Sequence, residues 1–170
     1  MSSGAGWKLA EGRTWRGKLE SEHPNHGKIV PVPPRMQKRF GTGRMLIPRP
    51  RDVEAAMRRP RKGRLITQAQ IRRMLAEAAG ADCACPLTTG MFVRIVAEAA
   101  EEDRRAGKSR ITPYWRTIRE DGKLNDKFPG GASAQASKLR HEGVIVALGK
   151  GKQPPRVPGF DRYLVRPRAS

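Results

Sequence analysis

The segment Ile111-Thr-Pro-Tyr-Trp-Arg-Thr-Ile-Arg-Glu-Asp-Gly-Lys-Leu124 is the most informative part of this sequence. It begins with a proline, two adjacent aromatic residues and an arginine: Pro113, Tyr114, Trp115 and Arg116. A β-prone pair follows and leads into Asp-Gly, which is typical of a tight turn. The segment therefore predicts a short strand that ends in a turn.

Helical patterns precede this segment. Residues 51–59 predict a short helix that ends before Pro60. Thr67 and Gln70 have the spacing of a capping box and predict a helix to about residue 79. A further helix is expected over about 90–106, capped by Thr88 or Thr89 and with Met91 in its apolar stripe. Its second half carries an acidic face, comprising Glu98, Glu101, Glu102 and Asp103. Two helices joined by a turn, with basic residues leading in, are typical of a helix-turn-helix.

A closing helix and a basic hairpin are expected after the segment. Ser133 is placed to cap a helix over 134–141. The runs 144–148 and 162–165 are β-prone and flank a basic loop. The predicted fold is therefore mostly α with a small β-hairpin, a winged-helix or helix-turn-helix domain over 50–148, with a basic loop and closing strand or tail over 149–170.

Residues 1–49 are rich in Gly, Pro, Lys and Arg, and their apolar residues have no period. Proline-containing runs here exclude regular helix and favour extended chain. We expect a basic arm that is disordered or loosely docked. Trp7 and Trp15 are interpreted as docking on the domain or as part of the disordered chain.

The chain has 35 Lys and Arg against 16 Asp and Glu, a net charge of +19. This excess predicts a polyanionic partner, most simply nucleic acid. The charge is +11 over residues 1–64, +3 over 65–148 and +5 over 149–170. The two ends therefore supply most of the positive field, and we expect them to anchor the partner.

The two cysteines and three histidines predict no metal site and no cofactor. Cys83 and Cys85 are too close for an ordinary disulfide and too few for structural zinc. No apolar run is long enough to span a bilayer, and the N-terminus lacks a signal-peptide core. We expect a cytoplasmic, nucleoid-associated monomer.

Four segments in order resemble one family. Lys62-Gly-Arg-Leu-Ile-Thr-Gln-Ala-Gln-Ile, Thr89-Gly90, Pro113-Tyr-Trp-Arg-Thr-Ile with Asp121-Gly122, and Leu139-Arg-His-Glu-Gly-Val after Gly130-Gly131 are its counterparts. They resemble the DNA-binding domain of the methylated-DNA–protein-cysteine methyltransferases and of the alkyltransferase-like proteins, which lack the reactive cysteine. The resemblance covers about residues 51–148 and implies DNA binding and recognition of damaged bases.

The departures from the family pattern bear on function. The resemblance places Tyr114 at the position of the nucleophilic cysteine and Trp115 at that of its histidine. Glu142 matches the family glutamate, and Arg116 matches a mainly structural arginine. A phenol of ordinary pKa, about 10, is a poor nucleophile toward an alkyl ether. The resemblance therefore implies a protein with no catalytic residue, whose former active-site pocket comprises Pro113, Tyr114, Trp115, Arg116 and Glu142.

Base recognition is altered as well. Gln68 stands where the family has a tyrosine that rotates the nucleotide, and Leu87 or Thr88 falls near the arginine that fills the vacated stack. Leu87 is able to wedge between bases but not to hydrogen-bond an orphaned base. The residues expected to contact nucleic acid are Arg64, Thr67, Gln68, Arg72, Leu87, Thr88, Thr89, Arg94, Lys150 and Lys152.

Three functions remain open from the sequence. The first is a non-catalytic protein that binds double-stranded DNA and is similar to alkyltransferase-like damage sensors. The second is an RNA-binding or protein-interaction module that has kept the fold and lost lesion recognition. The third is an alkyl transferase that uses Cys83 or Cys85 near a helix start, where a thiol pKa can fall.

Overall fold

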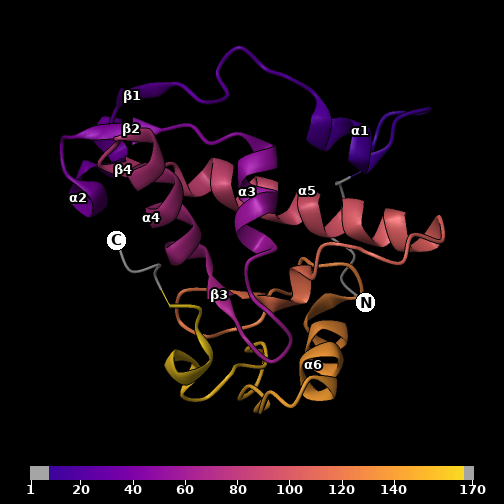
Figure 1. Cartoon of the computed structure of the whole chain (residues 1–170). Coiled ribbons are helices and arrows are strands. Elements are labelled where there is room, and N and C mark those ends of the chain that lie inside the picture. Colours follow the sequence, from indigo (N-terminus) through magenta and orange to yellow (C-terminus); the bar gives the residue numbers. More distant parts are fainter. Residues whose placement is uncertain (1–7, 167–170) are drawn as a thin grey trace.

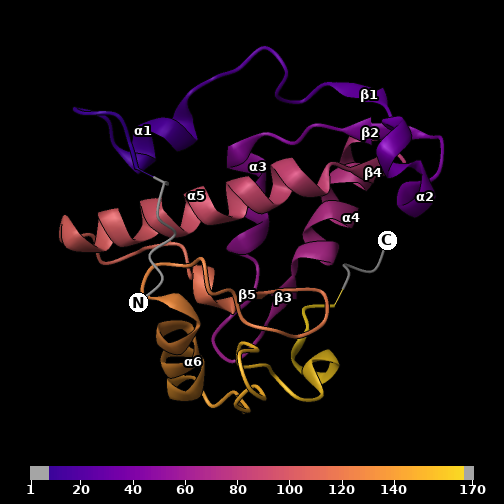
Figure 2. The same cartoon turned by 180° about the vertical axis from the view of Figure 1, so that it is seen from behind.

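The computed structural model describes residues 8–166 (Figures 1 and 2). It is mostly helical, with two small sheets. The α-helices are α1 Trp15–Glu20, α2 Gln37–Phe40, α3 Pro50–Met57, α4 Gln68–Ala79, α5 Pro86–Arg105 and α6 Gly131–His141. The strands are β1 Ile29–Pro31, β2 Arg44–Leu46, β3 Ile66–Thr67, β4 Cys83–Ala84 and β5 Thr117–Ile118. Short 3-10 turns are formed by Pro34–Met36, Tyr114–Arg116 and Phe160–Tyr163. The predicted mostly α class is confirmed.

Helix α5 is the central element, and α1 and α3 pack along it (Figure 1). Its inward face is fully buried, including Phe92, Val93 and Val96. The helix begins at Pro86, earlier than predicted, because proline is well suited to the first helical position. Thr88 and Thr89 therefore lie inside the first turn and do not cap it, which corrects the predicted start.

Helix α4 begins as predicted. The Thr67 hydroxyl accepts from the Gln70 backbone, and the Gln70 side chain accepts from the Thr67 backbone, which completes the capping box. Strand β3 precedes this helix directly and pairs in parallel with β5, so that Ile66 lies opposite Thr117 (Figure 2). This pairing joins the start of α4 to the 111–124 segment.

Residues 8–49 were predicted to be disordered or loosely docked, and the structure shows ordered elements docked on the domain. Strands β1 and β2 pair antiparallel, and β2 pairs in parallel with β4, so the arm and the domain share one sheet. Val32 and Met45 are buried there together with Cys85. The apolar residues of the arm need no helical or strand period to dock, because each packs against a residue that is distant in the sequence. Trp15 docks on the domain, while Trp7 lies outside the described residues.

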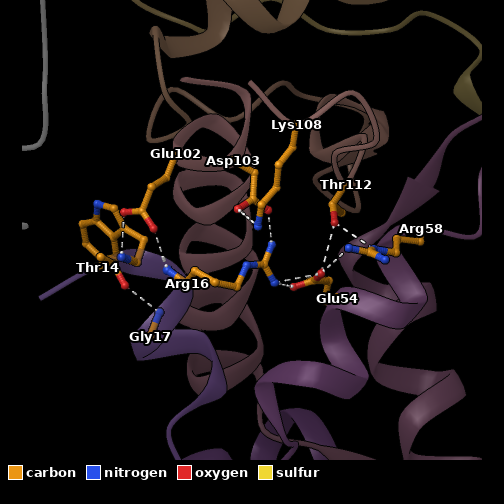
Figure 3. A network of polar contacts seen from close by, with 10 residues as sticks. Thr14, Arg16, Gly17, Glu54, Arg58, Glu102, Asp103, Lys108 and Thr112 are labelled. Atoms are coloured by element: carbon orange, nitrogen blue, oxygen red, sulfur yellow. Dashed lines mark hydrogen bonds and ion pairs between the residues drawn. The ribbon is translucent and has the colours of Figure 1, made fainter. Parts of the chain in front are cut away.

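The acidic half of α5 holds the arm in place (Figure 3). The Glu102 carboxylate accepts from the backbone N–H groups of Trp15 and Arg16, at 2.9 and 3.0 Å, at the start of α1. The Arg16 guanidinium pairs with Glu54 at 2.8 Å and with Asp103 at 2.7 Å. Glu102 and Asp103 of the predicted acidic face therefore form the docking surface of the arm, whereas Glu101 is buried and pairs with Arg104.

Helix α6 and the C-terminal segment form the lower layer in Figure 1. Helix α6 starts at Gly131, after Gly130 in the left-handed conformation, so Ser133 lies in the first turn and is not the predicted cap. The predicted hairpin also pairs differently. Ala147 exchanges backbone hydrogen bonds with Arg156 at 2.8 and 3.0 Å, whereas Leu164 bridges Leu65. The basic loop is therefore closed by Arg156 and not by the run 162–165.

No helix within residues 8–166 has the length and apolar character needed to cross a membrane.

Candidate nucleic-acid interface

Tyr114 is part of the protein core. Its side chain is 1% exposed, and its ring makes edge-on contacts with Trp115 and Phe128 at centroid distances of 5.4 and 5.3 Å. The phenol donates to Glu101 Oε1 at 2.8 Å. Burial, and then the hydrogen bond to Glu101, raises the pKa of Tyr114 well above its ordinary value. A buried phenol that is held in its neutral form is a poor nucleophile, and its ring fills this part of the core.

Glu142 is engaged by three donors. Arg116 pairs with it at 2.7 Å, the Trp115 indole N–H donates to Oε1 at 3.0 Å, and the Gly63 backbone N–H donates to Oε2 at 3.1 Å. Burial tends to raise the pKa of Glu142, but the hydrogen bonds from Arg116, Trp115 and Gly63 outweigh it and lower the pKa. The Arg116 guanidinium also donates to the Pro60 carbonyl at 2.8 Å. This cluster therefore fastens the 60–64 turn to the domain.

Replacing Glu142 with glutamine is expected to reduce the free energy of unfolding by about 1–2 kcal/mol near neutral pH, because charge-assisted bonds become neutral ones. A lowered carboxylate pKa contributes stability above the unfolded value, about 4.3, and that contribution is lost as pH falls through the folded pKa. The difference between wild type and Glu142→Gln should therefore shrink between about pH 7 and about pH 3 in urea denaturation. An equal difference at both pH values would contradict this role.

A basic groove of about 660 Å³ opens beside the N-terminal end of α5. It is lined by Arg39, Gln68, Arg72, Pro86, Leu87, Gly90, Met91, Arg94, Arg119, Glu120, Asp121, Asn125 and Lys127. Four of the predicted contact residues meet in it, namely Gln68, Arg72, Leu87 and Arg94. Arginines on three helices and on the loop after β5 thus line one groove, the arrangement expected of a surface that contacts phosphates.

The groove also contains two large exposed aliphatic side chains. Leu87 is 62% exposed and Met91 is 45% exposed, one helical turn apart at the start of α5. The sequence placed Met91 in the inward stripe, and the structure corrects this. Exposed apolar residues that lie among arginines are suited to contact base or sugar faces.

Glu120 neutralises part of the groove. Its carboxylate pairs with Arg39 at 2.7 Å and with Arg72 at 2.9 Å, so it links α2 to α4. The carboxylate is 49% exposed, and this leaves the pairs open to competition by another anion. Glu120 therefore occupies a position where a phosphate oxygen would find the same two guanidinium groups.

The other predicted contact residues lie elsewhere. Thr67 and Thr89 are buried, and the Thr89 hydroxyl donates to the Cys85 carbonyl at 2.7 Å, so neither is available to a partner. The Thr88 hydroxyl lies 3.3 Å from Cys85 Sγ and is not part of the groove lining. Arg64 lines a different pocket, and Lys150 and Lys152 are exposed on the 148–155 loop, away from the groove lining.

Sequence reasoning missed Arg39, Met91, Arg119 and Lys127 as groove residues. Met91 follows Leu87 by four residues, and this spacing was a signal that the two share a helix face. Arg39 had no signal, because it belongs to an arm whose docking depends on contacts far along the chain.

The cysteines do not form an activated thiol. Burial, followed by the nearby Asp82 and Cys85, raises the pKa of Cys83, the opposite of what a reactive thiolate requires. Cys85 is buried at the start of α5. Within residues 8–166 no three His, Cys, Asp or Glu side chains are placed to hold a metal ion.

No protein-family model matches this chain, and no curated protein matches it. Two solved structures of S. pombe proteins are similar to it: Atl1 with damaged DNA that contains O6-carboxymethylguanine, and the alkyltransferase-like protein ATL with DNA. Each is 17% identical to the chain, and each comparison covers 69% of this chain and 94% of the neighbour. The TM-scores are 0.48 for the Atl1 complex and 0.52 for the ATL complex.

The comparison with the ATL complex identifies the architecture. The chain has the alkyltransferase-like fold. The resemblance predicted from four sequence segments is thereby confirmed at the level of the fold. The function of this chain depends on the chemistry of its own site, because fold alone does not assign function.

Proposed function

We propose that this chain is a non-enzymatic, double-stranded-DNA-binding protein of the alkyltransferase-like type. The observation that carries the proposal is the basic groove, which brings Gln68, Arg72, Leu87 and Arg94 together at the start of α5. The N-terminal end of α5 adds the positive end of a 20-residue helix dipole to the groove. The S. pombe ATL structure, which has the same fold, is a complex with DNA, which supports this choice of partner.

In the proposed function the groove holds phosphates and the Tyr114 region is core. Tyr114 is buried and hydrogen-bonded, and Glu142 is committed to Arg116, Trp115 and Gly63. A flipped base has no place at a side chain that is 1% exposed. We therefore propose that the protein binds DNA by its backbone and grooves, without an alkylated-base pocket at Tyr114.

Fluorescence anisotropy with two matched duplexes, one plain and one with O6-methylguanine, tests this over a salt series. We expect equal affinities and a steep salt dependence, since each phosphate contact adds about −0.9 to the slope of log K against log salt. Tighter binding to the lesion at every salt concentration would contradict the filled pocket. Binding only to a matched RNA duplex would favour the RNA alternative, and binding to neither would leave the protein-interaction alternative.

Two substitutions in the groove, expected to change DNA affinity in opposite directions, test whether DNA binds there. Arg72→Gln is expected to weaken binding and to reduce the magnitude of the salt slope by about 0.9, because one phosphate contact is lost. Glu120→Gln is expected to strengthen binding, because Arg39 and Arg72 lose the carboxylate that competes with phosphate. Arg105→Gln, at the other end of α5, is the matched control and should leave affinity nearly unchanged. Equal effects of Arg72→Gln and Arg105→Gln would place the binding elsewhere.

A further inference from the structure

A second positively charged pocket, which we call the arginine pocket, lies between the 60–64 turn and the C-terminal segment. Its volume is about 370 Å³, and it is lined by Arg59, Arg61, Arg64, Leu164, Val165 and Arg166. Unlike the basic groove, it has no acidic lining residue. Four guanidinium groups therefore surround two aliphatic side chains.

The charges in the arginine pocket are not compensated. Within residues 8–166, none of the four arginines forms an ion pair. Arg59 donates to Met74 Sδ at 3.5 Å and Arg64 to the Arg162 carbonyl at 3.2 Å, and both acceptors are neutral. Four like charges around one hollow repel one another, and a bound anion relieves that repulsion.

Hydrogen bonds fix the two backbone segments that form the arginine pocket, the 60–64 turn and the C-terminal segment. Arg116 donates to the Pro60 carbonyl at 2.8 Å, and Glu142 accepts from the Gly63 backbone at 3.1 Å. Gly63 has a φ of +78°, which a side chain rarely adopts, so the turn requires glycine there. Leu65 and Val165 are joined by a backbone hydrogen bond of 2.9 Å, which attaches the C-terminal segment to β3. The cluster at the former active-site position thus positions the basic turn.

The arginine pocket and the basic groove lie on different sides of α4. Gln68 and Arg72 line the groove, whereas Gln70 donates to the Val165 carbonyl and Met74 accepts from Arg59. At about 100° per residue, the pair 68 and 72 points roughly 200° away from the pair 70 and 74. A short straight duplex seated in the groove therefore does not reach the arginine pocket.

We propose that the arginine pocket binds the sugar–phosphate backbone of a second nucleic-acid segment, so that one chain bridges two segments. Guanidinium groups bind phosphate oxygens in paired geometry, and the aliphatic floor of Leu164 and Val165 is suited to a sugar face. The bridging rests on the proposed function, which supplies the first segment in the basic groove. The binding in the arginine pocket stands on its own observations.

The test uses the full chain and 12-base-pair duplexes, which are too short to wrap around α4. Calorimetric titration gives the number of duplexes bound per chain, and energy transfer between donor-labelled and acceptor-labelled duplexes reports bridging. The variant Arg61→Gln/Arg166→Gln removes two guanidinium groups that make no ion pair or hydrogen bond with another described residue, so folding is expected to be kept. Arg13→Gln/Arg105→Gln removes the same charge at exposed positions outside both sites.

We expect two duplexes per chain and a bridging signal for wild type and for Arg13→Gln/Arg105→Gln. The Arg61→Gln/Arg166→Gln variant should lose the bridging signal and the second binding event. Two lost phosphate contacts correspond to a decrease of about 1.8 in the magnitude of the slope of log K against log salt. Bridging that survives in this variant would overturn the proposal, and so would a single duplex per wild-type chain whose binding Arg61→Gln/Arg166→Gln leaves intact. If Arg72→Gln leaves all binding intact while Arg61→Gln/Arg166→Gln abolishes it, the proposed groove function fails and the arginine pocket stands.

Discussion

Substitution of Tyr114 by alanine is expected to lower the free energy of unfolding by about 3–5 kcal/mol, the range found when a large aromatic side chain is removed from a core. The ring is 1% exposed and contacts Trp115 and Phe128, so its removal leaves a cavity. It also removes a donor from the buried Glu101. Urea denaturation followed by Trp fluorescence measures the change.

Tyr114→Phe is the matched control, because it keeps the ring and removes only the hydroxyl. We expect a loss of about 1.5–3 kcal/mol, the usual cost of one hydrogen bond to a charged acceptor. A loss as large as that of Tyr114→Ala would mean that the hydroxyl and not the ring dominates. Less than about 1 kcal/mol for Tyr114→Ala would place the side chain in an open pocket and would restore a base-binding role.

The same pair of proteins predicts a difference at alkaline pH. Burial, together with the bond to Glu101, raises the folded pKa of Tyr114 above the unfolded value of about 10. A raised pKa contributes stability that is complete below the unfolded pKa and is lost as pH rises above it. Wild type should therefore lose more stability than Tyr114→Phe above about pH 10. Parallel profiles would show that the phenol is solvated.

The second large effect is expected from Arg16→Ala, which should lower the free energy of unfolding by about 2–3 kcal/mol. Arg16 bridges Glu54 and Asp103, whose side chains are 9% and 10% exposed (Figure 3). Removal of one partner leaves buried charge under-compensated. We place the loss below the usual 3–5 kcal/mol, because the Arg16 side chain is 21% exposed and because Arg58 and Lys108 remain as partners.

Limited proteolysis gives a local readout of the same substitution. Arg16 belongs to α1, whose first backbone N–H groups are held by Glu102, so loss of its ion pairs should release residues 8–28 and make them cleavable. Arg13→Ala is the control, since Arg13 is exposed and forms no ion pair within the described chain. Equal stability and equal cleavage of the two variants would show that the arm docks without Arg16.

Local chemistry made several elements predictable. The Thr67 and Gln70 pair defines the start of α4 because both partners of the capping box lie within one turn. The Asp121-Gly122 turn and the end of α4 at Gly80 likewise depend on neighbouring residues, with Gly122 and Gly80 at positive φ. The alkyltransferase-like fold could be predicted from the sequence, because four local motifs resemble those of the family and occur in the same order.

The candidate site was predictable only in part. Gln68 and Leu87 were predicted from the resemblance, and Arg72 and Arg94 were predicted with them as nucleic-acid contacts. The structure brings all four into one groove. Arg39 was not predictable, because it reaches the groove through an arm whose strand β2 pairs with β4, with Met45 opposite Cys83, 38 residues further along the chain. The burial of Thr67 and Thr89 was not predictable either, because the sequence does not distinguish an exposed threonine at a helix start from a buried one.

The sequence alone was sufficient to predict the start of α4 at its capping box and the unequal distribution of positive charge along the chain. Only the tertiary structure decided that the arm is docked, that Tyr114 is core, and that the basic residues divide between the basic groove and the arginine pocket. The physical reason is the range of the interactions. Caps and turns form between residues a few positions apart, whereas buried ion pairs and shared cavities depend on which distant segments meet.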